Sequence, residues 1–198
     1  WPSRPAFFMG CHSIRAATMT LLFGFAPFLL FAILSRLSAD LALWLAFASA
    51  FVVTIRDFVE SPSLRLLDGV SLALFGILAL WRGFVAPELS LSAVRTIVDL
   101  GLCLAIFVSL LRRRPFSLPY ANRDSKIHHW PMPVFLRVNQ MISLVWGLTF
   151  AVMALADGAV TFLPVSFYLG IAMNVVALCF AITFTLRYPA LAAERQAR

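Results

Sequence analysis

Two ionisable residues, Arg95 and Asp99, stand inside a long apolar stretch of the sequence. They are four residues apart, so a helix would place both on one face. A charged side chain inside a bilayer costs a few kcal/mol or more unless it is paired, which makes such residues candidates for function. The spacing favours an intrahelical ion pair that faces a helix bundle. The alternative is a proton or ion relay, with Asp99 titrating and Asn174 of a later apolar stretch opposite it.

A second polar segment, residues 112–133, combines basic, aromatic and proline residues. Its candidate contact residues are Arg112, Arg113, Arg114, Pro115, Phe116, Tyr120 and Trp130. The prolines prevent a continuous helix, and aromatic side chains beside Arg are typical of a membrane–water interface. We therefore expect this loop to lie against anionic head groups. The alternative is a docking site for a cytoplasmic partner.

Three further residues are predicted to pack helices together. Asn139 and Trp146 share a stripe at helical spacing, which is more typical of packing than of a cofactor site. Asp157 follows on the same stretch of chain and joins this predicted packing set. The sequence contains no nucleophile–base pairing, phosphate loop or metal-ligand motif. We therefore expect no enzymatic activity, no cofactor and no bound metal.

The composition identifies the elements that must position these residues as membrane helices. Hydrophobic residues make up 62% of the 198 residues and charged residues only 13%. A soluble domain of this size could not bury so much apolar surface. The apolar runs are continuous rather than alternating, which excludes a lipid-facing barrel. The sequence predicts an all-α membrane protein, a polytopic bundle of about six transmembrane helices.

A helix needs roughly 20 apolar residues to cross a bilayer, and fewer where its ends snorkel. The predicted spans are residues 19–34, 39–55, 66–86, 89–111, 135–156 and 160–186. Pro27 is predicted to kink the first of them. Residues 19–188 would form one transmembrane domain with a cytoplasmic loop at 112–133, followed by a cytoplasmic tail at 189–198. Residues 1–18 lack an apolar or periodic pattern, so we expect a non-native or disordered extension there.

The basic residues fall mainly in alternate gaps between the predicted spans. Only three of the 16, Arg36, Arg82 and Arg95, lie on the side opposite to both termini. Cytoplasmic loops are enriched in Lys and Arg, so we expect a multi-pass protein of the bacterial cytoplasmic (inner) membrane with both termini cytoplasmic. Topology and anionic lipids then account for the net charge of +7, and we expect no nucleic-acid partner.

Short motifs carry a resemblance to known membrane proteins. They are Arg113-Arg114-Pro115-Phe116-Ser117, Tyr120-Ala121, Trp130, Pro133-Val134-Phe135, Asn139 and Val145-Trp146-Gly147. This pattern resembles uncharacterised bacterial integral membrane proteins and, more distantly, the intracellular septation protein A family, over most of residues 20–188. That family also has an early Phe-rich helix with a proline, as around Pro27, but it has Asn where this chain has Asp157. The resemblance implies a non-enzymatic protein that supports envelope integrity or septation through membrane-protein partners.

Two functions therefore remain open at the level of the sequence. The first is a structural or interaction protein that uses the loop at 112–133. The second is a small ion- or proton-coupled transporter that uses Arg95 and Asp99. In either case we expect contacts with anionic lipid head groups, with other inner-membrane or envelope proteins, or with a second copy of the chain in a homo-oligomer.

Overall fold

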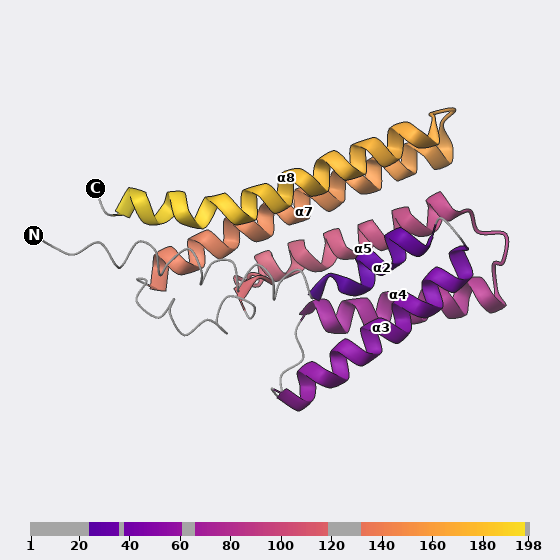
Figure 1. The fold of residues 1–198 in the computed structure, drawn as a ribbon, viewed down its shortest axis with the longest axis horizontal. Coiled ribbons are helices and arrows are strands. Elements are labelled where there is room, and N and C mark those ends of the chain that lie inside the picture. The colour runs from indigo at the N-terminus through magenta and orange to yellow at the C-terminus, as the bar shows by residue number, and fades with distance from the viewer. Residues whose placement is uncertain (1–23, 36–37, 61–65, 119–131, 197–198) are drawn as a thin grey trace, which may run out of the picture.

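The computed structural model describes residues 24–35, 38–60, 66–118 and 132–196, and within these ranges it is helical with no strand (Figure 1). The helices described are α2 (Ala26–Leu34), α3 (Ala39–Glu60), α4 (Leu66–Phe84), α5 (Leu91–Leu111), α7 (Met132–Phe162) and α8 (Phe167–Gln196). This confirms the predicted all-α class.

Five of these helices are long and apolar enough to cross a membrane. The candidate spans are Ala39–Val59, Leu66–Phe84, Leu91–Leu111, Pro133–Phe162 and Phe167–Pro189. The first predicted span is represented by the nine residues of α2, and its residues 19–23 lie outside the described residues. The predicted extension at 1–18 lies outside them as well. The five helices are compatible with a multi-pass membrane protein.

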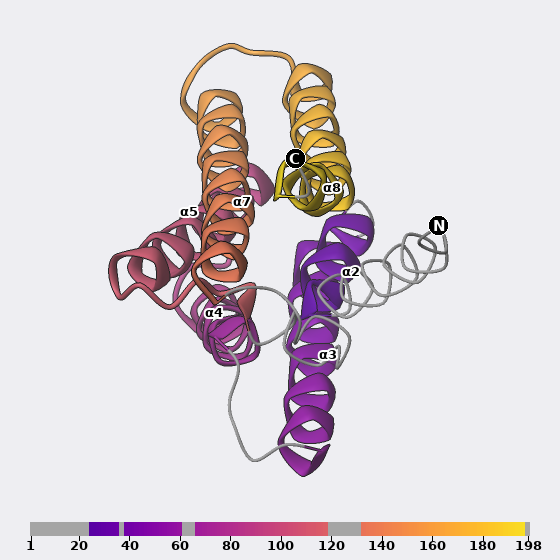
Figure 2. The same cartoon turned by 90° about the vertical axis from the view of Figure 1, so that its left-hand side faces the viewer.

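The helices alternate in direction along the bundle. The α4–α5 and α7–α8 turns lie at one end, on the right in Figure 1, and the ends of α3, α5 and α8 lie at the other. The most extensive packing joins α5 to α7, α3 to α4, α7 to α8, and α2 to α3. In Figure 2, α4, α5 and α7 form one side of the bundle, and α2, α3 and α8 form the other.

An aromatic cluster around α2 forms the centre of the core. Phe25 stacks on Trp146 with the ring centroids 4.5 Å apart. Phe28 contacts Phe75 of α4 with the centroids 5.0 Å apart. The indole Nε1 of Trp146 donates a hydrogen bond to the Thr185 hydroxyl of α8 at 3.0 Å. Since a buried indole N–H needs an acceptor, this bond lets a large apolar ring fill the junction of α2, α7 and α8.

The turn between α7 and α8 corrects the predicted boundary. Spans at 135–156 and 160–186 would place the turn at 157–159, but α7 continues to Phe162 and α8 begins at Phe167. Gly158 inside a helix costs only about 1 kcal/mol. Pro164 lacks an N–H and disfavours helical conformation in the residue before it. The proline therefore ends α7, and the Asp157-Gly158 pair does not.

Other helix ends also differ from the prediction. Helix α3 continues to Glu60 rather than residue 55, and α8 continues to Gln196 through Pro189, so the predicted tail is largely helical. The predicted kink at Pro27 agrees with the structure: Gly24 is helical, the helix is interrupted at Phe25, and Pro27 lies in the first turn of α2. An N–H in the first turn of a helix has no intrahelical acceptor, so the proline loses no helical hydrogen bond there.

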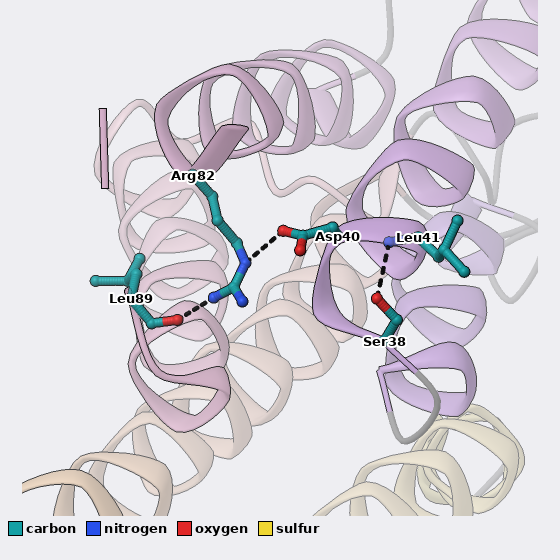
Figure 3. A network of polar contacts seen from close by, with 5 residues as sticks. All are labelled: Ser38, Asp40, Leu41, Arg82 and Leu89. Atoms are coloured by element: carbon teal, nitrogen blue, oxygen red, sulfur yellow. Dashed lines mark hydrogen bonds and ion pairs between the residues drawn. The ribbon is translucent and has the colours of Figure 1, made fainter. Parts of the chain in front are cut away.

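A polar network joins three helices at the end with the α4–α5 turn (Figure 3). Arg82 Nε of α4 donates to Asp40 Oδ1 of α3 at 2.5 Å, and Arg82 Nη1 donates to the carbonyl oxygen of Leu89, just before α5. The Ser38 hydroxyl accepts a hydrogen bond from the Leu41 N–H at 3.5 Å and caps α3. From the sequence alone Arg82 is predicted only as a topological charge, because Asp40 belongs to a different predicted span.

Candidate intramembrane polar site

Helix α5 presents Arg95 and Asp99 toward the interior of the bundle. Its N-terminus begins at Leu91, after Ser90, whose hydroxyl accepts a hydrogen bond from the Ala93 N–H at 3.2 Å. This cap satisfies one backbone donor of the first turn and favours the start of the helix at this residue. Asp99 lies about 12 Å along the axis from Leu91 and is 6% exposed. A carboxyl group is thus buried well inside the apolar span.

Helices α7 and α8 bring two more polar side chains to Asp99. Asn174 Nδ2 of α8 donates a hydrogen bond to Asp157 Oδ2 of α7 at 3.0 Å. The carboxyl groups of Asp99 and Asp157 line the same cavity and interact electrostatically. A hydrogen bond between them would require one shared proton, because an ionised carboxylate is only an acceptor. The arrangement is therefore suited to holding a proton or another small cation.

Arg95 links this group to two neighbouring helices. Its Nη2 donates a hydrogen bond to the Ser35 hydroxyl at the end of α2, at 2.7 Å. Its guanidinium carbon lies 5.7 Å from the centroid of the Phe167 ring at the start of α8. The Arg95 charge also acts on both Asp99 and Asp157. An ion pair between Arg95 and Asp99, as predicted, is not found among the described residues. Both side chains instead belong to a larger polar group that spans α2, α5, α7 and α8.

A cavity of about 210 Å³ adjoins the polar group, between α2, α5, α7 and α8. Its polar lining residues are Arg95, Asp99, Asp157 and Asn174, and its aromatic ones are Phe25, Phe28, Phe31, Trp146 and Phe150. Along α5, α7 and α8 the polar residues lie nearer the α4–α5 and α7–α8 turns than most of the apolar ones do. The cavity therefore has a polar end and a longer apolar part.

The structure brings together all three residues of the predicted polar site, Arg95, Asp99 and Asn174, around one cavity. It adds Asp157, which was predicted as a packing residue. The hydrogen-bond partner of Asn174 is Asp157 rather than Asp99. One signal in the sequence pointed to this role: Asp157 shares a helix face with Trp146, Phe150 and Met153, so it faces the same neighbours.

Of the other predicted packing residues, Trp146 lines the cavity, and Asn139 lies elsewhere in the core. Asn139 is 3% exposed, and its amide Nδ2 donates to the carbonyl oxygen of Phe135 at 2.9 Å. The Ser117 hydroxyl, which follows α5, donates to Asn139 Oδ1 at 2.9 Å. Ser117 and Asn139 together thus hold the segment after α5 against α7. This role of Ser117 was not predicted from the sequence.

The predicted contact loop is divided by the structure. Arg112, Arg113 and Arg114 are exposed at the end of α5. Pro115 and Phe116 are buried instead, and Phe116 meets Phe25 edge-on with ring centroids 6.1 Å apart. These two residues pack in the core because the chain turns back onto α2 after Arg114, so they are not a surface for head groups or partners. Tyr120 and Trp130 lie outside the described residues.

Within the described parts of the chain, no three His, Cys, Asp or Glu residues are grouped so that they could hold a metal ion. Comparison of the chain with protein-family models, with curated proteins and with solved structures finds no match. Any functional conclusion therefore depends on the polar site and the cavity themselves.

Proposed function

We propose that this protein is a small carrier of the bacterial cytoplasmic membrane that couples solute movement to a proton or a monovalent cation. The observation that carries the proposal is the meeting of Asp99 and Asp157, from two different helices, beside a cavity inside the spans. Ionisable residues at such a depth typically mark ion pathways and proton relays.

The charge balance of the site supports cation coupling. Arg95 contributes one positive charge, while Asp99 and Asp157 would contribute two negative charges if both were ionised. Two like charges this close, away from water, repel each other strongly. One proton or monovalent cation removes the excess negative charge. Because the two carboxyl groups belong to α5 and α7, its binding and release change the attraction between these helices.

Helix α8 is the element best suited to move when the site changes its occupancy. Only 17% of the most apolar 18-residue stretch of α8 is buried, compared with 56% of the corresponding stretch of α7. Its principal packing partner is α7, and it contributes Asn174 to the polar group. A helix with few buried contacts costs less to displace than a central one. Movement of α8 against α7 would open the polar end of the cavity toward the α7–α8 turn.

The orientation of the carrier is part of the same proposal. Among the described residues, Arg56, Arg137, Arg187 and the cluster of Arg112, Arg113 and Arg114 lie toward the end of the bundle opposite to the α4–α5 turn. The positive-inside rule assigns that end to the cytoplasm. The polar end of the cavity then lies nearer the outer face of the membrane.

The coupling is tested in proteoliposomes that contain a trapped pH indicator and carry an imposed membrane potential. We expect a proton flux that depends on the protein and that falls to the level of protein-free liposomes in Asp99→Asn and in Asp157→Asn. The matched control is Glu88→Gln, which neutralises an exposed carboxylate in the α4–α5 turn and should retain the flux. Absence of flux, or unchanged flux in both Asp variants, would refute proton coupling.

A second candidate function is favoured by the exposed basic cluster Arg112, Arg113 and Arg114 at the end of α5. In this reading the protein is a structural or interaction protein that supports envelope integrity or septation by binding acidic surfaces of other membrane proteins. Crosslinking followed by mass spectrometry should recover such partners from the wild type. Replacing all three arginines by Ala should abolish their recovery, and retention of every partner would count against this function.

A further inference from the structure

We infer that the cavity between α2, α5, α7 and α8 binds a small organic cation whose apolar body is about the size of one ring. The inference rests on the proposed carrier function and names the class of its solute. Three properties of the cavity support it: the hydrogen-bonding character of its polar end, the chemistry of its walls and its volume.

The polar end of the cavity offers mainly acceptors to a ligand. Asn174 uses its amide Nδ2 to bond Asp157, and its buried Oδ1 has no hydrogen-bond partner among the described residues. A buried acceptor without a partner is energetically unfavourable, so a ligand that donates a hydrogen bond there gains affinity. Together with the carboxyl oxygens of Asp99 and Asp157, this acceptor matches the N–H groups of an ammonium ion.

An anionic ligand would find only one charged partner at this site. Among the described residues, Arg95 is the single basic residue that lines the cavity, and it already donates to the Ser35 hydroxyl and lies over the Phe167 ring. The two carboxyl groups of Asp99 and Asp157 would repel an anion from the same end. The site therefore favours a cation over an anion.

The walls favour an organic cation over a bare metal ion. Phe28, Phe31, Trp146 and Phe150 line the apolar part of the cavity. Aromatic rings attract cations through their quadrupoles and cover apolar groups at the same time. Small hard metal ions require about six oxygen ligands, which a wall made largely of carbon does not supply. A cation with a hydrocarbon body satisfies both ends of the cavity.

The volume of the cavity limits the size of the ligand. It measures about 210 Å³. By comparison, an engineered apolar cavity of about 150 Å³ in another protein accommodates benzene. The cavity can therefore hold one six-membered ring with a short aminoalkyl chain, such as 2-phenylethylammonium. Ligands with two fused rings and a chain would need the helices to separate.

The experiment measures binding of three probes of similar size to the purified full-length chain in detergent, by equilibrium dialysis. The probes are 2-phenylethylamine, which is a cation at pH 7, neutral 2-phenylethanol, and anionic 3-phenylpropionate. We expect the amine to bind about tenfold or more tightly than the alcohol, which is the equivalent of one charge-assisted hydrogen bond. The anion should bind more weakly than the alcohol.

Two variants locate the binding at this cavity. Asp157→Asn should weaken amine binding about tenfold or more and leave alcohol binding unchanged. Asn174→Leu keeps both carboxyl groups and removes the unpaired acceptor, so it should also weaken amine binding and provides a second test if Asp157→Asn does not fold. Glu88→Gln is the control and should bind all three probes as the wild type does.

The outcomes separate this inference from the proposed function. Equal affinity for the three probes, tighter binding of the anion, or amine binding that both variants retain would overturn the inference. Proton flux that depends on Asp99 without any amine binding would overturn it and leave the carrier function intact. Amine binding that is lost in Asp157→Asn, with no flux in proteoliposomes, would support the binding site and refute coupled transport.

Discussion

At the scale of single residues, Arg113 explains the basic-basic-proline sequence after α5. It is the one described non-glycine residue with positive φ, at 54°. The Arg113 N–H donates to the Leu110 carbonyl oxygen at 2.9 Å, and the Arg114 N–H donates to that of Ser109 at 3.0 Å. This pair of bonds is a Schellman motif, in which a left-handed residue ends the helix and a proline commonly follows. Local backbone geometry thus explains where α5 ends and why a proline follows, whatever the role of the three charges.

The left-handed conformation of Arg113 predicts an unusual response to glycine. Arg113→Gly and Arg113→Ala both remove the charge, but only glycine adopts positive φ without steric cost. We expect the Gly variant to exceed the Ala variant by about 1 kcal/mol in free energy of unfolding. The same pair of variants at Arg112, where φ is −74°, should show no advantage for Gly. Thermal unfolding in detergent measures both pairs, and equal stabilities at position 113 would contradict this account.

At the scale of helices, the end of α4 is held by Arg82 to the start of α3 and to the turn before α5 (Figure 3). The Asp40 side chain is 61% exposed, whereas that of Arg82 is only 14% exposed. Exposed ion pairs contribute little because water screens them. The bond from Arg82 to the Leu89 carbonyl oxygen is better shielded. The arginine therefore matters more as a donor that closes the α4–α5 turn than as a partner of Asp40.

A double-mutant cycle tests this division of roles. Asp40→Ala and Arg82→Ala, singly and together, should give a coupling of about 0.2–1 kcal/mol that decreases as salt is added. Arg82→Ala should cost more than Asp40→Ala, because it also leaves the Leu89 carbonyl without its donor. Chemical unfolding of the four proteins in detergent provides the values. A larger loss for Asp40→Ala would indicate that the ion pair, rather than the closure of the turn, is the main contribution.

At the scale of the whole molecule, the alternating helices separate two ends that differ in charge. The α4–α5 and α7–α8 turns share one end, while the exposed arginines after α5 lie at the other (Figure 1). In a membrane, the positive-inside rule makes this difference an orientation signal. Under the proposed carrier function, it also sets the direction from which a solute would reach the polar end of the cavity.

Accessibility of single cysteines tests this orientation. In a chain with Cys11, Cys103 and Cys179 replaced by Ala, we expect Glu88→Cys to react with a membrane-impermeant maleimide added to intact cells whose outer membrane has been permeabilised. Arg113→Cys should react only after the cytoplasmic membrane is also opened. Labelling in the reverse order would invert the proposed orientation, and the polar end of the cavity would then lie nearer the cytoplasm.

Much of the helical layout was predictable from local properties of the chain. The third and fourth spans, predicted at 66–86 and 89–111, match α4 and α5 to within two residues at each end. The ends of these helices are predictable because polar turns bound each apolar run. The predictions for α7 and α8 failed at their shared turn. The sequence pattern did not distinguish an Asp-Gly pair, which a helix tolerates, from a proline that ends it.

The sequence by itself determined the membrane-type composition, the helical class and the charge difference between the two ends, since each depends only on the order of residues along the chain. Only the tertiary structure decided that Asp157 belongs with Asp99 and Asn174 rather than with packing residues. That result depends on how α5, α7 and α8 rotate about their axes when they pack. Rotation is set by side-chain fit, such as that of Phe25 on Trp146, which hydropathy does not encode.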